Sequence, residues 1–328
     1  MGLPRRGLLH LAASVTSAAT LPLLPRRATA QAWPSRPVRW VVGFAPAGGN
    51  DIVARLMGQW LSERTGQPFI VDNKPGAATN IATEIVVNAN PDGYTILLVG
   101  VAAAINATFY DNLSFSFLRD IAPAAGIMAI PLFVATSPSL PARTLPEFIA
   151  YARARPGKIN MGSAGIGSSG HLAGELFNMM AGVNLVHVPY RGNGPALASL
   201  LSGEVQVVFP TPPSSIEFIR TGKLRGLATT GAARSPALPD MPAVGEFVPG
   251  YETTAWYGVG VPKATPPDIV DRIYREVAAG LADANLKARF ADLGGAPMPL
   301  SSADFTKLIA EETDKWAKVI RRSNLKPV

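Results

Sequence analysis

Two glycine-rich loops are the first residues of this sequence whose types and spacing could do chemistry. Residues 165–170 read Gly-Ile-Gly-Ser-Ser-Gly, a match to the G-x-G-x-x-G pattern in which a loop leads into a helix and binds a pyrophosphate. Residues 47–50, Ala-Gly-Gly-Asn, also precede a helical pattern but do not match it. Such loops aim unpaired backbone N–H groups and the positive end of a helix dipole at one point, so they are suited to binding an anion.

A dinucleotide site would need more than the glycines. An acidic residue should follow about 20 positions on, to hold the ribose hydroxyls. The next predicted strand instead leads into Pro189, Tyr190 and Arg191. Arg191 could accept a 2′-phosphate, so an NADP-dependent oxidoreductase remains an alternative. The pair of loops favours a different hypothesis, in which the two loops face each other and hold a small carboxylate without a cofactor.

Single side chains near the loops each have a structural interpretation beside the functional one. Asp51 could hold a ligand ammonium group, but an acid at this point also stabilises a helix N-terminus. His171 could contact ligand or only structure, and His187 lies in a predicted strand. Arg191 is the preferred charged ligand contact, and Tyr190 could line the cleft. Neither histidine has metal-spaced partners, so no metal site is expected.

A hydrolase is not indicated. Ser168 and Ser169 resemble a nucleophile only superficially, because the sequence has no G-x-S-x-G and no base can be assigned to them. The paired loops instead favour a binding protein and not an enzyme, with the NADP-dependent oxidoreductase as the alternative.

The elements that must position these loops repeat along the chain. Apolar periodicity predicts strand, helix, strand, helix, strand over 38–44, 51–61, 68–71, 79–89 and 94–99. The same order returns over 158–162, a helix after 168, 185–188, 195–201 and 205–209. Asn50 is the expected N-cap of the first helix. Two similar α/β lobes follow, each a mainly parallel βαβαβ sheet flanked by helices.

Two extended segments, 131–136 and 256–261, connect the lobes and predict a hinge. The tail from residue 266 is helical, with a capping-box pattern at Ser301 and Asp304, and is expected to pack on the first lobe. The expected boundaries are 36–134 plus 257–328 for lobe 1 and 135–256 for lobe 2.

The first thirty residues have the pattern of a secretory signal. Arg5 and Arg6 precede an apolar run, and an Ala-Thr-Ala site ends at Ala30. The pattern fits general secretion or twin-arginine export, and predicts cleavage near Ala30. Residues 1–30 hold four arginines and no acid, so the net charge of +7 falls to +3 after cleavage. This small charge does not indicate nucleic-acid binding.

The chain has no cysteine. Disulfides, thiolate metal sites and a lipid-anchoring cysteine are therefore excluded. An exported chain without cysteine fits the bacterial periplasm, and we expect a monomer there.

Six motifs together carry a family resemblance, and they span essentially the whole chain after the signal. They lie at 44–55 (FAPAGGNDIVAR), 71–76 (VDNKPG), 90–95 (NPDGYT), 170–177 (GHLAGELF), 187–192 (HVPYRG) and 234–240 (RSPALPD). In this order they resemble the Bug/TctC-type solute-binding proteins of tripartite tricarboxylate transporters.

The resemblance implies a two-lobed periplasmic binding protein (type II-like) that binds a di- or tricarboxylate, an amino acid or an aromatic acid in the cleft between its lobes. It would deliver this ligand to a membrane permease, and a role as ligand-sensing partner of a membrane receptor is a further alternative. The family holds its ligand mainly through backbone groups of the two glycine loops. The expected ligand-binding residues are Phe44, Ala45, Pro46, Ala47, Gly48, Gly49, Asn50, Asp51, Val101, Ala102, Ser163, Ala164, Gly165, Gly167, Ser168, Ser169, His171, Tyr190 and Arg191.

Three positions depart from the family pattern. Ala47 replaces a frequent glycine, Asn50 stands where Thr or Ser is common, and the segment 210–213 (PTPP) replaces an Asp-Asn pair. The last change concerns the far side of the expected pocket.

Overall fold

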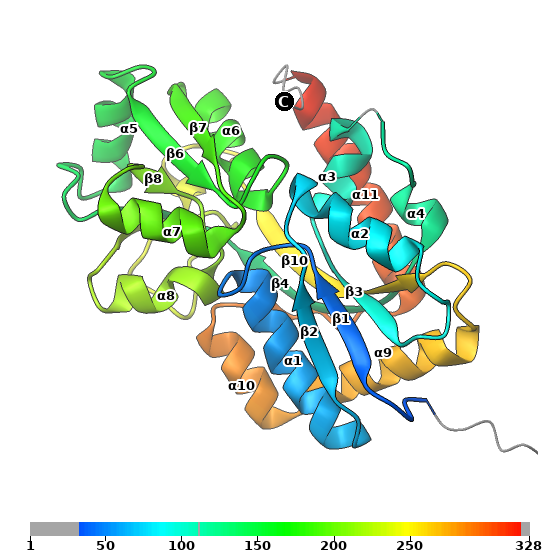
Figure 1. Cartoon of the computed structure of the whole chain (residues 1–328). Coiled ribbons are helices and arrows are strands. Elements are labelled where there is room, and N and C mark those ends of the chain that lie inside the picture. Colours follow the sequence, from blue (N-terminus) through cyan, green and yellow to red (C-terminus); the bar gives the residue numbers. More distant parts are fainter. Residues whose placement is uncertain (1–32, 111, 323–328) are drawn as a thin grey trace, which may run out of the picture. The chain divides into compact units, whose positions relative to one another are not determined.

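Two β-sheets, each built around a parallel three-stranded unit, organise the chain (Figure 1). The computed structural model describes residues 33–110 and 112–322, so the expected signal segment lies outside the described residues. The six-stranded sheet has the order β11-β4-β10-β3-β1-β2, and the five-stranded sheet has the order β7-β6-β8-β5-β9. The fold is the expected α/β fold of two lobes.

The first lobe begins with two crossover units. Its elements are β1 (Val38–Val42), α1 (Gly49–Thr65), β2 (Phe69–Asn73), the 3-10 turn η1 (Ala77–Thr79), α2 (Asn80–Val87), β3 (Thr95–Gly100), α3 (Ala102–Phe109), α4 (Phe117–Asp120) and β4 (Ile121–Pro131). β1 pairs in parallel with both β2 and β3.

The second lobe repeats this plan. Its elements are β5 (Phe133–Thr136), α5 (Leu145–Arg153), β6 (Ile159–Ser163), α6 (Ser169–Ala181), β7 (Leu185–Pro189), α7 (Asn193–Ser202), β8 (Val207–Val208), α8 (Pro212–Arg220), β9 (Arg225–Thr229) and η2 (Val244–Glu246). β6 pairs in parallel with β7 and β8, as β1 does with β2 and β3. In both lobes the first strand of the unit is central, so the loops that follow the strands gather at one edge of each sheet.

The chain then returns to the first sheet through β10 (Thr254–Pro262), followed by α9 (Pro267–Ala282), α10 (Ala284–Asp292), β11 (Ala296–Pro297) and α11 (Ser302–Arg322). α11 lies along α3 and β4, and α9 packs on β4 and α1, so the tail covers the first lobe as expected (Figure 1). Trp316 and Phe305 of α11 are buried there. Among the described residues, no helix combines the length and apolar character needed to cross a bilayer.

The sheets are mixed, whereas mainly parallel sheets were expected. β10 runs antiparallel to β3 and β4, and β5 runs antiparallel to β8 and β9. The reason lies in the connecting segments. The segments that connect the lobes enter the sheets as the strands β5 and β10 and pair there in the antiparallel direction. β4 also extends over Ile121–Pro131, whereas the sequence predicted an extended crossing only at 131–136.

The two passages between the sheets lie side by side. The chain crosses at Leu132, between β4 and β5, and returns after β9. The Leu132 amide donates to Thr230 Oγ1 at 2.7 Å, and the Thr230 amide donates to the Leu132 carbonyl at 2.8 Å. Thr230 Oγ1 also donates to the Thr253 carbonyl at 2.8 Å, just before β10. The buried Thr230 thus ties both crossings together.

Several expected boundaries are wrong. The N-cap of α1 is Gly48 and not Asn50, because Asp51 Oδ2 accepts from the Ala47 amide and lets the helix begin at Gly49. α7 begins at Asn193, two residues early, after Gly192 at φ 143°. β8 is only two residues long, and the tail contains the short strand β11. The capping pattern is confirmed, since the Asp304 amide donates to Ser301 Oγ at 3.2 Å.

Candidate functional site

A small cavity lies where the glycine loops of the two lobes meet. It is called the inner cavity here, and its volume is about 20 Å³. Its lining combines residues of both lobes: Phe44, Asn50, Gly100, Val101, Ala102, Ala164, Ser168, Ser169, Asn193, Ala255, Trp256 and Tyr257. A cavity of this size has room for about one water molecule.

Four helices begin at the inner cavity. Asn50 is in the first turn of α1, Ala102 opens α3, Ser169 opens α6 and Asn193 opens α7. Helix geometry leaves the first amides of each helix without a partner in their own helix, and the dipole places partial positive charge there. None of the described lining residues is charged. The cavity is therefore electropositive through peptide groups alone and can hold an anion.

One buried hydroxyl in the lining lacks a partner. Tyr257 is 2 % exposed, and its Oη lies beside Thr211 without forming a hydrogen bond of ordinary geometry to it or to another described residue. Burial raises the pKa of Tyr257, so the phenol is neutral and carries a hydrogen to donate. An unpaired buried hydroxyl is costly, which makes it a candidate ligand donor.

The first-lobe loop is held by Asp51. The Asp51 carboxylate accepts from the Ala47 amide and from Arg55 Nε, both at 3.0 Å. Burial acts to raise the Asp51 pKa, but its hydrogen bonds with Arg55 and Ala47 outweigh this and lower the pKa. Ala47 has φ 63°, the left-handed conformation that suits the glycine frequent at this position in the family. Asp51 thus holds the loop from the first turn of α1 and lines neither cavity described here.

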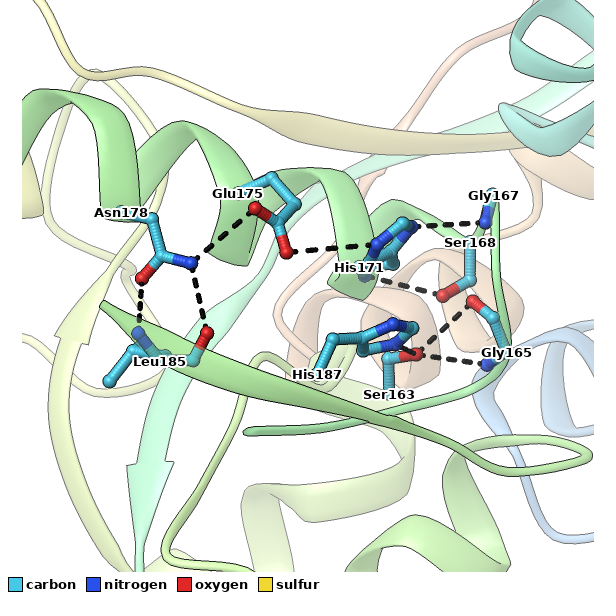
Figure 2. A network of polar contacts seen from close by, with 9 residues as sticks. All are labelled: Ser163, Gly165, Gly167, Ser168, His171, Glu175, Asn178, Leu185 and His187. Atoms are coloured by element: carbon cyan, nitrogen blue, oxygen red, sulfur yellow. Dashed lines mark hydrogen bonds and ion pairs between the residues drawn. The ribbon is translucent and has the colours of Figure 1, made fainter. Parts of the chain in front are cut away.

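The second-lobe loop is held by two histidines (Figure 2). The Gly167 amide donates to His171 Nδ1 at 3.1 Å, and Ser163 Oγ lies 2.6 Å from His187 Nε2. The imidazole rings stack with centroids 3.9 Å apart and planes inclined by 23°. Burial, together with the neighbouring His187, lowers the His171 pKa to about 3, and burial lowers the His187 pKa to about 4. Both rings are therefore neutral at ordinary pH.

Backbone contacts join the two lobes beside the inner cavity. The Ala45 amide donates to the Arg191 carbonyl at 3.0 Å. Gly49 is packed so closely on the second lobe that an added Cβ would lie 2.1 Å from Thr211 Oγ1. Thr211 in turn accepts from Asn193 Nδ2 at 3.0 Å. The segment 210–213, which departs from the family pattern, therefore contributes a close packing partner for α1.

A second, larger cavity adjoins the first. This outer pocket has a volume of about 480 Å³ and is lined by Gly43, Phe44, Pro75, Gly76, Ala77, Ala78, Ile81, Tyr110, Ala164, Gly165, Ile166, Pro189, Tyr190 and Arg191. It shares Phe44 and Ala164 with the inner cavity, and these two residues pack with Ala102 as a small apolar cluster. Ala77, Ala78 and Thr79 all have positive φ, so the turn that borders the outer pocket is strained.

The structure separates the expected ligand-binding residues into three groups. Seven line the inner cavity: Phe44, Asn50, Val101, Ala102, Ala164, Ser168 and Ser169. Gly165, Tyr190 and Arg191 line the outer pocket, as do Phe44 and Ala164. The remainder line neither cavity and instead shape the loops or join the lobes: Ala45, Pro46, Ala47, Gly48, Gly49, Asp51, Ser163, Gly167 and His171.

Sequence reasoning missed several lining residues. Asn193 opens α7 and offers the same loop-to-helix geometry as Asn50, so the loop at 189–194 carried a usable signal. Tyr257 and Trp256 lie in β10, and their position depends on how that strand crosses the first sheet. No local pattern would have indicated them.

A dinucleotide does not fit this arrangement. An added Cβ at Gly170 would lie 2.6 Å from the Phe209 carbonyl oxygen, so this glycine serves close packing of helix against strand. The residues of the pattern do not face one site: Gly165 and Ile166 line the outer pocket of about 480 Å³, whereas Ser168 and Ser169 line the inner cavity of about 20 Å³, which has no room for a pyrophosphate. Among the described side chains, no three His, Asp or Glu gather as metal ligands would.

Comparison with known proteins identifies relatives over nearly the whole length. Residues 53–325 match the family model described as tripartite tricarboxylate transporter family receptor. The chain is 33% identical to protein BugT of Bordetella pertussis over 302 residues, covering 91% of this chain and 92% of that protein.

Three solved structures are similar in fold. "R. palustris Rpa4515 with adipate" has a TM-score of 0.87 at 35% identity, covering 90% of this chain and 100% of that one. The periplasmic binding protein BugD has a TM-score of 0.86 at 30% identity, covering 90% and 99%. MatC from Rhodopseudomonas palustris, with bound malate, has a TM-score of 0.83 at 29% identity, covering 88% and 99%.

Proposed function

Because the chain belongs to the tripartite tricarboxylate transporter receptor family, we propose that it is a periplasmic receptor that binds a small carboxylate between its two lobes. It then delivers this ligand to the membrane permease subunits of such a transporter. The solved relatives that hold adipate and malate support a carboxylate as the ligand class.

One observation carries the proposal for this chain. The N-terminal turns of α1, α3, α6 and α7 converge on one cavity that no charged side chain of the described residues lines. This arrangement stabilises a negative charge through peptide dipoles. The unpaired Tyr257 hydroxyl adds a neutral donor that a carboxylate oxygen would satisfy.

The two cavities suggest how the ligand is oriented. The inner cavity of about 20 Å³ is too small for a whole ligand, so it takes one carboxylate as the lobes part and close again. The rest of the ligand passes Phe44 and Ala164 and lies in the outer pocket of about 480 Å³. The Arg191 guanidinium, at the lining of this pocket, meets a second carboxylate. An extended dicarboxylate fits this division better than a compact tricarboxylate.

The lobes are proposed to move about the two crossings tied by Thr230, with the boundaries at 36–134 plus 257–328 and 135–256.

The secretory pattern of residues 1–30 and the periplasmic relative BugD support export to the periplasm. Co-purification of permease subunits with the liganded chain tests delivery. Equal recovery with and without ligand would argue against it.

A ligand series of constant chain length tests the binding proposal. Calorimetry would compare adipate, hexanoate and 1,6-hexanediol, which share a six-carbon chain and carry two, one and no carboxylates, with hydroxyl groups at both ends of the diol. We expect adipate to bind most tightly, hexanoate more weakly and the diol not at all. At 100 times its dissociation constant a ligand stabilises the fold by about 2.7 kcal/mol, or roughly 4 °C in Tm for a chain of this length. Binding of the diol as tightly as adipate would overturn the proposal, as would the absence of binding by citrate, malate and adipate alike.

A further inference from the structure

The stacked histidines lie behind the second-lobe glycine loop and not in either cavity (Figure 2). We propose that His171 and the Ser163–His187 pair are positioning residues that hold the loop in its ligand-binding conformation. The effect on ligand affinity rests on the proposed function. The effect on the conformation of the loop can be measured without a ligand.

His171 holds one amide of the loop. The Gly167 N–H donates to His171 Nδ1 at 3.1 Å, so Nδ1 carries a free lone pair and the ring hydrogen is on Nε2. His171 Nε2 faces the Glu175 carboxylate, with Oε1 at 3.8 Å. A protonated ring, or a neutral ring with its hydrogen on Nδ1, would have no acceptor at Nδ1 for the Gly167 amide. The Gly167 contact therefore requires the neutral Nε2–H tautomer.

Ser163 holds the other amide. The Gly165 N–H donates to Ser163 Oγ at 3.1 Å, and the same oxygen lies 2.6 Å from His187 Nε2. Ser163 Oγ also lies 3.1 Å from the Gly165 carbonyl oxygen. Since Ser163 has a single hydroxyl hydrogen, the His187 tautomer decides whether that hydrogen goes to the ring or to the carbonyl. His187 thus fixes the orientation of the group that holds Gly165.

These contacts act on backbone that would not keep its shape alone. Gly165 has φ 128° and Gly167 has φ 76°, both outside the range that most residues adopt. The loop ends at Ser168, whose Oγ accepts from the His171 amide at 3.3 Å and caps α6. Ser168 and Ser169 line the inner cavity. Holding Gly165 and Gly167 therefore places the α6 N-terminus at the ligand.

The stack couples the two contacts. The rings lie 3.9 Å apart, so a displacement of either imidazole disturbs the other. The Phe109 ring of the first lobe meets His171 edge-on at a centroid distance of 6.3 Å. The histidine pair therefore also lies at the boundary between the lobes.

Paired substitutions at one position test the proposal. In His171→Asn the side-chain oxygen replaces Nδ1 as acceptor, whereas His171→Phe keeps the ring and removes the acceptor. Hydrogen exchange of the segment 163–170 without ligand, and adipate affinity, are measured for both variants. We expect His171→Phe to speed exchange and weaken binding, each about ten-fold, and His171→Asn to stay within about three-fold of the parent protein. Ser163→Ala should act like His171→Phe on the Gly165 amide.

Asn178→Ala is the matched control. Asn178 lies on the same helix and bonds both backbone groups of Leu185 on β7, at 2.9 Å and 3.3 Å. It also donates to Glu175 Oε2 at 3.4 Å, the carboxylate oxygen that does not face His171. Its removal lowers the unfolding midpoint but should leave loop exchange and affinity unchanged. Equal effects of the Asn and Phe variants at position 171, or unchanged loop exchange in His171→Phe and Ser163→Ala, would overturn the proposal. If the parent protein binds no carboxylate, the proposed function fails, and the exchange data still decide the role of the histidines.

Discussion

The backbone amide of Ala45, in the first lobe, donates to the carbonyl of Arg191, in the second lobe, at 3.0 Å. The lobes are therefore joined here through main-chain atoms, and Arg191 is also one of the residues that line the outer pocket. Substitution at Arg191 can remove the guanidinium without removing the contact between the lobes.

Arg191→Ala should change ligand preference and leave stability nearly unchanged. Loss of the guanidinium removes the proposed partner of the second carboxylate, so adipate affinity should fall about ten-fold while hexanoate affinity stays the same. Calorimetry with both ligands measures this, and Arg191→Lys should give an intermediate value. An equal loss for both ligands would place Arg191 at the first carboxylate instead.

Gly49→Ala should keep the lobes from closing. An added Cβ would lie 2.1 Å from Thr211 Oγ1 of the second lobe and 2.9 Å from Tyr257 Oη of the first, so either the Thr211 side chain or the lobe that carries it must shift. We expect adipate affinity to fall at least about ten-fold, and small-angle scattering to show a more open protein. Thr211→Ala should partly restore binding in the double variant.

Gly48→Ala is the control for that prediction. Its Cβ would meet its nearest neighbours at 3.6 Å, an ordinary contact, and its φ of −85° suits alanine. Affinity should be unchanged. If both alanine variants bind as the parent protein does, the close approach of Gly49 to Thr211 is not part of the closed state in solution.

Tyr257→Phe should separate binding from stability. The Tyr257 hydroxyl is buried without a partner among the described residues, so its removal should not destabilise the fold and could raise the unfolding midpoint. If the hydroxyl donates to the ligand carboxylate, adipate and hexanoate should both bind about ten-fold more weakly. Unchanged affinity for both ligands would remove Tyr257 from the site.

Stability should fall as the pH drops from about 6.5 toward 4. His171 and His187 stay neutral in the folded protein because burial lowers their pKa values to about 3 and about 4. An unfolded chain protonates both near pH 6.5, so below that pH it binds more protons than the folded chain and is favoured. We expect a loss of about 2 kcal/mol for each histidine between pH 7 and pH 5, before any opposing contribution from other groups.

One facing group opposes this trend. Glu175, on the same helix as His171, has a pKa raised by burial, so it takes up a proton more readily in the folded state. α3 presents the Phe109 ring to His171 and no charge. Urea unfolding at several pH values measures the slope for the parent protein and for the double variant His171→Asn, His187→Gln. A slope that is the same in both proteins would assign the acid sensitivity to other groups.

The parallel units of the fold could be predicted from sequence because their periodicity is local. The strands around Val41 and Met161 and the helices after the glycine loops stand where the apolar patterns indicated, and the motifs at 44–55 and 170–177 identified the family. The predicted ends of helices are wrong where a tertiary contact sets the position at which the helix begins. Gly48 caps α1 because Asp51 binds the preceding amide and because Gly49 packs on Thr211.

The candidate site was only partly predictable for the same reason. Ser168 and Asn50 follow visible loop signals, whereas Tyr257 reaches the inner cavity through the antiparallel pairing of β10 with β3. The stack of His171 on His187 depends on how α6 lies over β7 and has no signature in their spacing. These contacts arise from tertiary packing, which one sequence does not display.

The lack of charged side chains around the inner cavity has a consequence for where such a receptor can work. Attraction built from buried peptide dipoles is weakened little by dissolved ions, whereas an exposed guanidinium is screened within about 10 Å at 0.1 M salt. Retention of the first carboxylate should therefore be nearly the same in dilute and in saline surroundings. Any effect of ionic strength on ligand affinity would arise at Arg191. Added salt would therefore reduce the preference for a dicarboxylate over a monocarboxylate before it reduces the affinity for the first carboxylate.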